Sequence, residues 1–479
     1  MSLFSLFRGR SGRGRKILVA FASQTGAAEA IAWRSANALI GAGGFVRVAA
    51  LGSLDPAALA EAGTLLVVTS TYGAGESPDS ARAFVRRHMG ARVNFRGLEF
   101  AVLALGDRKY DATFCQFGRG LDRWLAQCGA RRLFDVVSVD GDDDDTAMGK
   151  WCEQLGKLGA RCDVENLMPG APQDWVLAAR HLLNPGSVGG ESWAVALTPK
   201  NPAHLHWTAG DIAEIWPRND PGTVADFIAR HDLDGETLFK WKGHWTPLAT
   251  ILAMSRLPAD HEVAGISVQW LVERLEWLGA REYSIASLPA DGRLELLVRK
   301  AVKNDGSLGL GSGWLTQTCA AGGTVSLRLR PNPNFHPPAE QDAPLPQILI
   351  GAGTGMAGLR AHLKYRAAAG RKEAWLLFGE RGRGDLYYAE EIEAWRKDGT
   401  LTRADLVFSR EEGSRRYVQH LVEAAGADVR ELVVARGASI LVCGGLEMAA
   451  GVHNALIAIL GEDELDAMTQ DGRYRRDIY

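Results

Sequence analysis

Five short apolar runs in the first third of the chain constrain its fold more than any other feature. Each run is bounded by turn residues, and together they cover residues 17–22, 45–50, 64–69, 100–105 and 133–139. Segments with helical periodicity lie between the runs, at residues 27–40, 80–89 and 117–128. This alternation predicts a doubly wound parallel sheet of five strands in the order 2-1-3-4-5.

Length and composition limit the possible functions. A chain of 479 residues is too long for one core, so we expect several domains. The net charge of -3, without a strongly basic helix or zinc-type Cys/His spacing, argues against a nucleic-acid partner and a metal site. The six cysteines lack CxxC spacing, so we expect neither a disulfide framework nor an iron-sulfur site, and a cytoplasmic location.

The N-terminus is not expected to direct export. Residues 1–15 have a short apolar patch followed by basic residues and glycines, which is the wrong order and length for a signal peptide. We expect a flexible leader, with transient contact to a membrane surface as an alternative. No run approaches the roughly 18 apolar residues that a transmembrane segment needs.

The loop after the first predicted strand is a candidate phosphate site. Its small and hydroxyl residues lead into a helix, whose free N–H groups favour a phosphate. Ordinary helix capping is the alternative. The candidate contacts are Ser23, Gln24, Thr25, Gly26, Ala27 and Ala28.

Two further loops, after the third and fourth strands, would converge on the same ligand. In the expected strand order a flat ring would lie between Tyr72 and Tyr110. The three loops resemble those of flavodoxin-like FMN domains, which implies an FMN site in residues 16–163. The other candidate contacts in these two loops are Thr71, Gly73, Gly75, Leu105, Gly106, Asp107, Phe114 and Cys115.

An acidic run follows the fifth predicted strand at residues 140–145. Such runs are usually solvated caps. The alternative is an acidic docking face for an electron acceptor, whose binding would depend on salt.

Residues 164–190 collect prolines and glycines and are expected to form a linker, with a short helical piece near residues 175–183. Strand-like alternation then predicts an antiparallel barrel over residues 191–345. A helical, tryptophan-rich insertion interrupts it at about residues 219–278, and its last part, residues 263–278, is expected to be one amphipathic helix.

Two short motifs in this barrel resemble the FAD-binding barrel of the ferredoxin-reductase family. The first is Arg281-Glu-Tyr-Ser284, and the second is a glycine-rich turn that opens a helix at residues 309–315. The resemblance implies that Arg281 binds the FAD pyrophosphate, Tyr283 the ring or ribityl face, and Ser284 a position near N5. Backbone contacts to the diphosphate would come from Gly309, Leu310, Gly311 and Ser312.

The last third, residues 346–479, predicts a dinucleotide-binding α/β domain. A buried-strand run at residues 347–350 leads into a glycine-rich loop and a helix, which is the geometry of a phosphate site. The candidate contacts are Gly353, Thr354 and Gly355. Further on, Phe378-Gly-Glu-Arg381 matches an element of the reductase family, which adds Arg381 to the candidates.

A cluster of hydroxyl and guanidinium groups indicates NADPH rather than NADH. The 2′-phosphate of NADPH needs such donors, because arginine can hold it with charge-assisted bidentate bonds. An NADH enzyme would instead place an acidic residue near the free 2′-hydroxyl. The candidate contacts are Ser409, Arg410, Arg415, Tyr417 and Gln419.

The C-terminal tail resembles that of diflavin reductases. In that family a terminal aromatic residue covers the isoalloxazine ring, and an acidic residue two places earlier supports hydride transfer. The resemblance assigns these roles to Tyr479 and Asp477, and it places Cys443 near the nicotinamide. Ser284, Cys443, Asp477 and Tyr479 are therefore the candidate catalytic residues.

With these elements in order, the chain resembles the diflavin reductases, and among them the sulfite reductase flavoproteins. The resemblance implies electron transfer from NADPH through FAD and FMN to an acceptor near the FMN face, such as a haemoprotein. One alternative is a self-sufficient NADPH oxidoreductase for quinones or ferric complexes. Another is a non-catalytic flavin-binding module. The sequence leaves the acceptor and the oligomeric state open.

Overall fold

The computed structural model describes residues 16–479 except 24–25, 73–74, 92, 142–143, 168–171, 188, 242–243, 338–344 and 412–414. The expected N-terminal leader lies outside the described residues. The chain divides into two compact units: Met1–Gly170 with Gly461–Tyr474, and Ala171–Leu460 with Arg475–Tyr479. Each unit is described here by itself, and the domain limits expected from the sequence stay predictions.

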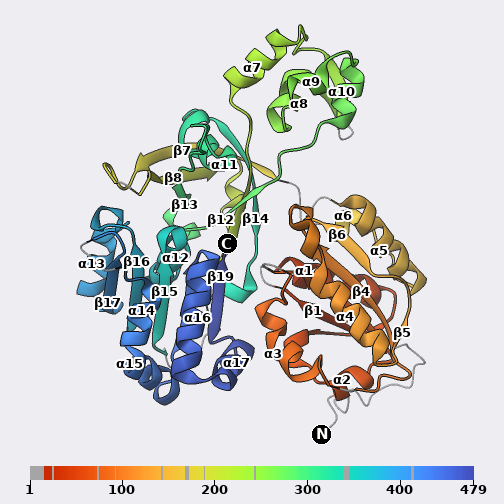
Figure 1. Ribbon diagram of the computed structural model, residues 1–479, viewed down its shortest axis with the longest axis vertical. Helices are drawn as coiled ribbons and strands as arrows, with labels where there is room; N and C mark the ends of the chain where they lie inside the picture. The colour runs from red at the N-terminus through yellow and green to blue at the C-terminus, as the bar shows by residue number, and fades with distance from the viewer. Residues whose placement is uncertain are drawn as a thin grey trace. The chain divides into compact units, whose positions relative to one another are not determined.

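A parallel sheet forms the centre of the first unit (Figure 1). Its main path has the order β2-β1-β3-β4-β5, and β6 also pairs with β4, as the alternating pattern predicted. Of the expected fifth strand, residues 133–139, only residues 137–139 are in a strand, β6, and the short β5 precedes the expected run. The strands are β1 (Lys16–Ala22), β2 (Phe45–Ala50), β3 (Thr64–Ser70), β4 (Glu99–Gly106), β5 (Arg131–Arg132) and β6 (Val137–Asp140).

Helices cover both faces of this sheet because its central strands are apolar on both sides. Leu18 of β1 packs in one buried cluster with Phe84 and Trp124, whereas Val19 packs in the other with Ile31 and Trp151. The helices of the unit are α1 (Ala27–Gly41), α2 (Pro56–Ala60), α3 (Asp79–His88), α4 (Gln116–Gln127), α5 (Asp145–Lys157), α6 (Val164–Leu167) and α17 (Glu462–Gln470).

One pair of cysteines departs from the sequence expectation. A disulfide joins Cys152 of α5 to Cys162, across a turn in which Gly159 has a φ of 96°. The spacing of ten residues carries no recognisable pattern, so only the turn that ends α5 brings the two sulfurs together. The other four cysteines are free.

An antiparallel sheet of order β12-β9-β14-β7-β8-β13 opens the second unit. Among the described residues its edge strands meet only at an isolated bridge between Ile285 and Leu296, so the predicted barrel is not closed. The strands are β7 (Gln173–Leu182), β8 (Ser192–Pro199), β9 (Ile212–Trp216), β12 (Arg281–Ser284), β13 (Leu294–Arg299) and β14 (Thr324–Arg330).

The helical piece expected near residues 175–183 is wrong, because residues 173–182 form strand β7. The Ala and Leu content of the segment favours a helix by propensity. Pairing with β8 and β14 overrides it and buries Trp175 and Leu177 in the core of the sheet. Residues 173–182 of the expected linker are thus part of this sheet.

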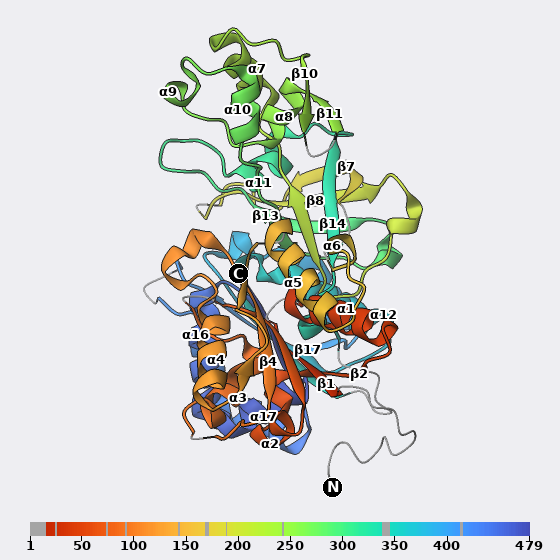
Figure 2. The same ribbon diagram turned by 90° about the vertical axis from the view of Figure 1, so that its right-hand side faces the viewer.

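The insertion forms a small cluster with its own core, set beyond the antiparallel sheet (Figure 2). The single helix expected over residues 263–278 is wrong: Gly265, with a φ of 78°, separates two short helices. A hairpin that the sequence did not predict also occurs here. The elements are α7 (Pro221–Arg230), β10 (Leu238–Trp241), β11 (His244–Pro247), α8 (Leu248–Met254), α9 (Asp260–Val263) and α10 (Val268–Arg274).

The rest of the second unit is built on a sheet of order β17-β16-β15-β18-β19, with its first four strands parallel. It matches the predicted dinucleotide-binding domain. The strands are β15 (Gln347–Ala352), β16 (Ala374–Glu380), β17 (Leu401–Phe408), β18 (Ser439–Gly444) and β19 (Tyr474–Ile478). The helices are α11 (Leu310–Gly313), which precedes the sheet, then α12 (Met356–Ala368), α13 (Ala389–Lys397), α14 (Val418–Ala424), α15 (Gly426–Arg430) and α16 (Leu446–Leu460).

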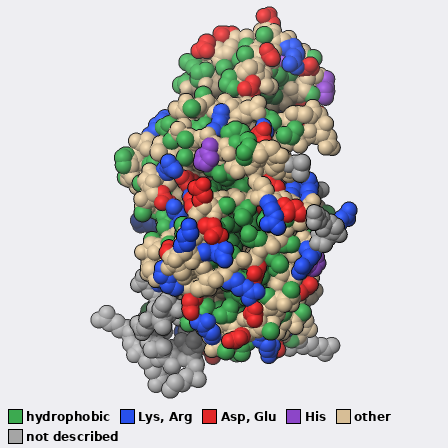
Figure 3. Space-filling view, turned by 90° about the vertical axis from the view of Figure 1, so that its left-hand side faces the viewer, with side chains coloured by type: hydrophobic (Ala, Val, Ile, Leu, Met, Phe, Trp, Pro, Cys, Tyr) green, Lys and Arg blue, Asp and Glu red, His purple; other side chains and the backbone are tan. Residues whose placement is uncertain are grey.

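Basic and acidic side chains are interspersed on the surface drawn in Figure 3. None of the helices within the described residues is long and apolar enough to cross a membrane.

Candidate functional site

Three loops of the first unit lie at the carboxyl ends of neighbouring strands. They follow β1, β3 and β4, which are adjacent in the sheet. Within the first loop the Ser23 Oγ accepts a hydrogen bond from the Gly26 N–H at 2.9 Å. At the start of the second loop, the Thr71 N–H donates to the carbonyl of Leu105 near the end of β4 at 3.0 Å. The three loops therefore leave the same edge of the sheet, and their convergence on one ligand stays a prediction.

The described residues of these loops fit a polar ligand such as the FMN phosphate. The Thr71 hydroxyl is buried and, within the described part of the chain, has no hydrogen-bond partner, so a bound ligand would satisfy it. Gly106 must be glycine, because a Cβ there would lie 2.7 Å from the Cys115 nitrogen. Gly26 has a φ of 90°, which turns the chain from β1 into α1.

Some of the predicted FMN contacts cannot be placed. Gln24, Thr25 and Gly73 lie outside the described residues. Tyr110 falls within a 3-10 segment (Arg108–Thr113), and its side chain is not described. The ring position between Tyr72 and Tyr110 therefore stays a prediction.

The FAD motif of the second unit is assembled from two segments that pack directly against each other. Arg281 and Tyr283 lie on β12, which pairs with β9. A Cβ at Gly311 would lie 2.7 Å from the Arg281 Cγ and 2.8 Å from the Tyr283 Oη. The backbone at Gly311 therefore lies too close to β12 for any side chain. This close approach fits the prediction that the two segments bind the same FAD diphosphate.

Ser312 has a structural contact that the sequence did not indicate. Its hydroxyl accepts a hydrogen bond from the Ala301 N–H at 3.0 Å. The helix that follows the turn is short: α11 has four residues and continues as a π-helical segment (Trp314–Thr318). The predicted contacts to the FAD diphosphate would therefore come from backbone groups of the turn rather than from the Ser312 hydroxyl.

Three of the four candidate catalytic side chains meet at one point. The Ser284 hydroxyl, at the end of β12, donates a hydrogen bond to the Asp477 Oδ2 at 2.6 Å. The Cys443 thiol of β18 faces the same oxygen at 3.6 Å. Strand β19 carries Asp477 into this position beside β18.

Burial controls the charge of this cluster. It raises the pKa of the Asp477 carboxyl, although the hydrogen bond from Ser284 opposes the rise. Burial also raises the pKa of the Cys443 thiol, and the neighbouring Asp477 raises it further. Cys443 is therefore a neutral thiol, and Asp477 takes up a proton more readily than an exposed aspartate does.

The predicted dinucleotide loop is a 3-10 turn (Gly353–Gly355) that connects β15 to α12. Gly353 has a φ of 61°, and a Cβ at Gly355 would lie 2.0 Å from the Cys443 carbonyl oxygen. Both positions therefore require glycine. The loop leads directly into a helix of 13 residues, whose N-terminal N–H groups fit a phosphate.

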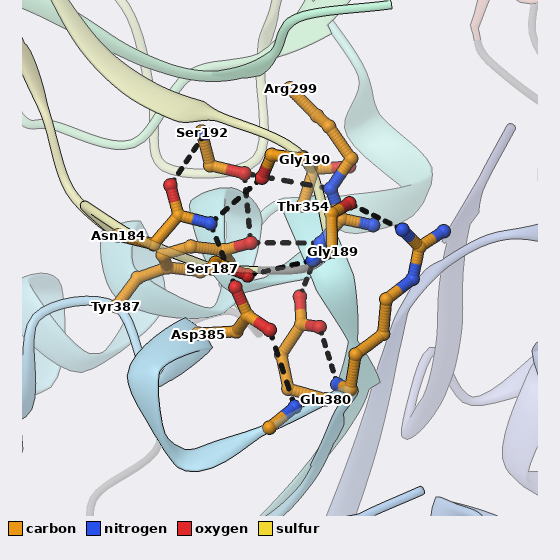
Figure 4. A network of polar contacts seen from close by, with 12 residues as sticks. Asn184, Ser187, Gly189, Gly190, Ser192, Arg299, Thr354, Glu380, Asp385 and Tyr387 are labelled. Atoms are coloured by element: carbon orange, nitrogen blue, oxygen red, sulfur yellow. Dashed lines mark hydrogen bonds and ion pairs between the residues drawn. The ribbon is translucent and has the colours of Figure 1, made fainter. Parts of the chain in front are cut away.

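Arg299 of β13 lies beside this loop, and the sequence reading missed it. Its NH1 is 3.6 Å from the position a Cβ would take at Gly353. Its NH2 donates to the Glu380 Oε1 at 2.5 Å and to the Tyr387 Oη at 2.8 Å. Figure 4 shows the guanidinium next to Thr354. Only the sheet packing could reveal this position, because an isolated arginine at a strand end carries no recognisable pattern.

The same polar network ties the antiparallel sheet to the last sheet (Figure 4). Asn184 donates to the Gly190 carbonyl at 2.9 Å and to the Asp385 Oδ1 at 2.7 Å. Arg381, a predicted cofactor contact, donates instead from its NH1 to the Gly189 carbonyl. Polar contacts thus join the turn between β7 and β8 to the segment that follows β16.

The predicted 2′-phosphate contacts lie around the carboxyl ends of β16 and β17. The backbone N–H groups of Ser409 and Arg410 donate to the carbonyls of Glu380 and Arg381. Arg415 and Tyr417 are exposed, and Tyr417 precedes α14, which carries Gln419. Exposed guanidinium and hydroxyl groups fit an anionic phosphate, but residues 412–414 between them are outside the described range.

Tyr479, the last candidate catalytic residue, follows β19 directly. Its hydroxyl lies 2.9 Å from the Thr354 Oγ1. The terminal aromatic residue, the dinucleotide loop and the Ser284–Asp477 cluster therefore occupy one region of the second unit.

The comparisons with known proteins agree with this geometry. The flavodoxin model matches residues 19–155, and the model of the oxidoreductase NAD-binding domain matches residues 349–454. Over 97% of its length the chain is similar to sulfite reductase [NADPH] flavoprotein alpha-components. That of Serratia proteamaculans (strain 568) is 30% identical with 90% of its length covered, and that of Bacillus subtilis (strain 168) is 29% identical with 89% covered.

A third relative, the same component from Neisseria meningitidis serogroup B, is 28% identical with 89% of its length covered. Both family models fall on the sheets whose loops form the two candidate sites. The chain therefore belongs to the sulfite reductase flavoprotein family of diflavin reductases.

Proposed function

We propose that this chain passes electrons from NADPH through FAD and FMN to a protein acceptor, and that the acceptor is a haemoprotein of the sulfite reductase type. The contacts of Ser284 and Cys443 with the Asp477 Oδ2 carry the proposal. They place a hydroxyl, a thiol and a buried carboxyl beside the dinucleotide loop, which is an arrangement suited to proton and hydride management.

The bound flavins and nicotinamide supply the redox chemistry, and the protein supplies binding, orientation and electrostatics. Asp477 is the group of this cluster that can take up and release a proton, and the hydrogen bond that its Oδ2 accepts from the Ser284 hydroxyl favours the ionised form. Cys443 stays a neutral thiol and keeps a second charge out of the cluster. The burial of Asp477 and Cys443 excludes water from this point.

NADPH binding is assigned to three groups of donors. The N–H groups at the start of α12 and the NH1 of Arg299, beside Gly353, would hold the dinucleotide phosphates. Arg410 and Arg415 serve the 2′-phosphate, and their charge makes NADPH the preferred donor over NADH. Glu380 orients Arg299 through the 2.5 Å contact to its NH2, which leaves NH1 directed to the loop.

In the first unit, Thr71 and the N–H groups at the start of α1 are assigned to FMN. The domain limits proposed are 16–163 for FMN, 191–345 for FAD and 346–479 for NADPH. Within the proposed linker at 164–190, residues 173–182 form β7 and contribute to the FAD-binding sheet. The expected cytoplasmic location stays a prediction.

The test compares flavin-replete enzyme with enzyme depleted of FMN but retaining FAD. With NADPH, the depleted enzyme is expected to reduce a dye at an unchanged rate and to lose reduction of a sulfite reductase haemoprotein. Equal haemoprotein reduction by both preparations would contradict the proposal. Flavin that NADPH fails to bleach in either preparation would indicate a non-catalytic flavin-binding module.

A further inference from the structure

A β-bulge in β7 turns Arg180 toward the inner face of the antiparallel sheet. The register of β7 against β8 shifts by one residue between Leu177 and Ala179, so Ala178 is an extra residue in the strand. An extra residue inverts the in-and-out alternation of the side chains that follow it. Leu177 is buried, Ala179 is exposed, and Arg180 is partly buried on the same face as Leu177.

The guanidinium of Arg180 binds three backbone carbonyls of one short segment. Its NH1 donates to the Cys319 carbonyl at 2.8 Å and to the Leu315 carbonyl at 3.3 Å. Its NH2 donates to the Gln317 carbonyl at 3.0 Å. The planar fork of an arginine reaches such a group of acceptors together, which the single ammonium of a lysine does not reproduce.

These carbonyls belong to the π-helical segment Trp314–Thr318 and to the residue after it. In an α-helix the Cys319 N–H would donate to the Leu315 carbonyl, four residues earlier. Here it donates to the Trp314 carbonyl at 2.9 Å, five residues earlier, and the Leu315 carbonyl accepts from Arg180 instead. Arg180 therefore binds the acceptor that an α-helical register would use, and it favours the rarer π-helical register.

The π-helical segment follows directly on α11 and the glycine turn. The Thr316 Oγ1 donates to the Ser312 carbonyl at 2.7 Å, which joins the segment to the turn. The turn is closely packed on its other sides: a Cβ at Gly313 would lie 2.6 Å from the Leu308 Cβ, and Gly311 lies against β12. A change of register in the π-helical segment would therefore displace the turn from β12.

We propose that Arg180 is a positioning residue for FAD. By binding three carbonyls it holds residues 314–318 in the π-helical register, and this register fixes the turn at residues 309–312 against β12. The inference rests on the proposed function, because it takes this turn as part of the FAD diphosphate site. Arg180 acts through the backbone of the turn, so its loss should loosen FAD and leave FMN, assigned to the first unit, unaffected.

The first test measures the release of each flavin from the flavin-replete enzyme. The enzyme is diluted, free flavin is collected by ultrafiltration, and chromatography quantifies FAD and FMN separately. Arg180→Gln should release FAD about tenfold faster or more, as expected for the loss of a charge-assisted hydrogen bond, and FMN at an unchanged rate. His181→Gln changes the exposed neighbour of Arg180 on β7 and is the matched control, which should release both flavins at the unmodified rates.

The second test separates positioning from a general loss of stability. Methylguanidinium carries the planar fork of arginine, whereas ethylammonium carries only a charge. In Arg180→Ala, methylguanidinium should slow FAD release toward the unmodified rate, and ethylammonium at the same concentration should not. Deuterium exchange in the peptide that contains Cys319 should be faster in Arg180→Ala, because the Cys319 N–H makes the π-helical bond. Methylguanidinium should slow this exchange again.

The results distinguish this inference from the function on which it rests. If the unmodified enzyme binds no FAD, the proposed function fails and the inference with it. If it binds FAD, the inference alone is overturned by any of three outcomes. These are FAD release from Arg180→Gln at the unmodified rate, equal acceleration of FAD and FMN release, and rescue by ethylammonium as complete as rescue by methylguanidinium. If Arg180→Gln does not fold, Arg180→Lys, which keeps the charge without the fork, takes its place under the same criteria.

Discussion

Replacing Ser284 by alanine should shift the pH dependence of turnover through Asp477. The hydroxyl donates at 2.6 Å to a carboxyl that is 7% exposed, and it opposes the effect of burial on the pKa of Asp477. A hydrogen bond to a charged group contributes about 1.5–3 kcal/mol, and one pKa unit corresponds to about 1.4 kcal/mol. Losing this bond destabilises the ionised form, so the pKa of Asp477 should rise by about one to two units.

The assay is the pH profile of kcat with NADPH and a dye acceptor, from pH 4 to pH 9. The inflection due to Asp477 should move to higher pH in Ser284→Ala. Whether kcat rises or falls with pH across this inflection reports whether the enzyme is active with the Asp477 carboxyl ionised or protonated. Ser284→Thr, which keeps the hydroxyl, should retain the original inflection.

Ser287→Ala is the matched control, because Ser287 is also buried but bonds to the Arg293 carbonyl at 3.1 Å rather than to Asp477. It should leave the inflection in place. A lower kcat in Ser284→Ala at every pH, with an unmoved inflection, would refute the electrostatic link between Ser284 and Asp477.

Three further changes test the binding loop, the cofactor preference and the core. Arg410→Ala combined with Arg415→Ala should raise the KM for NADPH about tenfold or more and barely change that for NADH, because each lost charge-assisted bond costs about 1.5–3 kcal/mol. Gly355→Ala should lower Tm and NADP⁺ affinity, since a Cβ would lie 2.0 Å from the Cys443 carbonyl. Burial lowers the pKa of His362 from 6.5 to about 3, so the folded protein keeps this ring neutral while the unfolded chain takes up a proton below pH 6.5. The free energy of unfolding should therefore fall by about 1.4 kcal/mol for each pH unit below 6.5. His362→Gln should therefore narrow the Tm difference between pH 7 and pH 5.

Matched controls exist for each of these changes. Arg383→Ala removes an exposed guanidinium outside the predicted phosphate contacts, and equal losses with NADPH and NADH in the double variant would contradict the 2′-phosphate assignment. Gly384→Ala has open space for a Cβ, and equal Tm values for it and Gly355→Ala would contradict the steric argument. His206→Gln changes an exposed histidine. If it narrowed the Tm difference between pH 7 and pH 5 as much as His362→Gln does, the explanation from burial of His362 would be contradicted.

Much of the fold followed from local patterns. The strands β1 to β4 and their order, and the position of the loop before α12, agree with the sequence, because each depends on neighbouring residues. Apolar runs report burial on both faces of a sheet, and glycines report turns that a Cβ would block. The same local reasoning failed at β7, where helical propensity gave way to pairing with β8.

The sequence by itself determined which chemical groups the chain offers: the Arg281-to-Ser284 strand, three phosphate loops, the arginines near Tyr417 and the terminal Asp477 and Tyr479. Only the tertiary structure decided which of them meet. Ser284 and Asp477 are 193 residues apart, and Arg299 and Glu380 are 81 apart. Periodicity and glycine placement act over a few residues, whereas these contacts exist because two sheets pack together and carry distant side chains to one point.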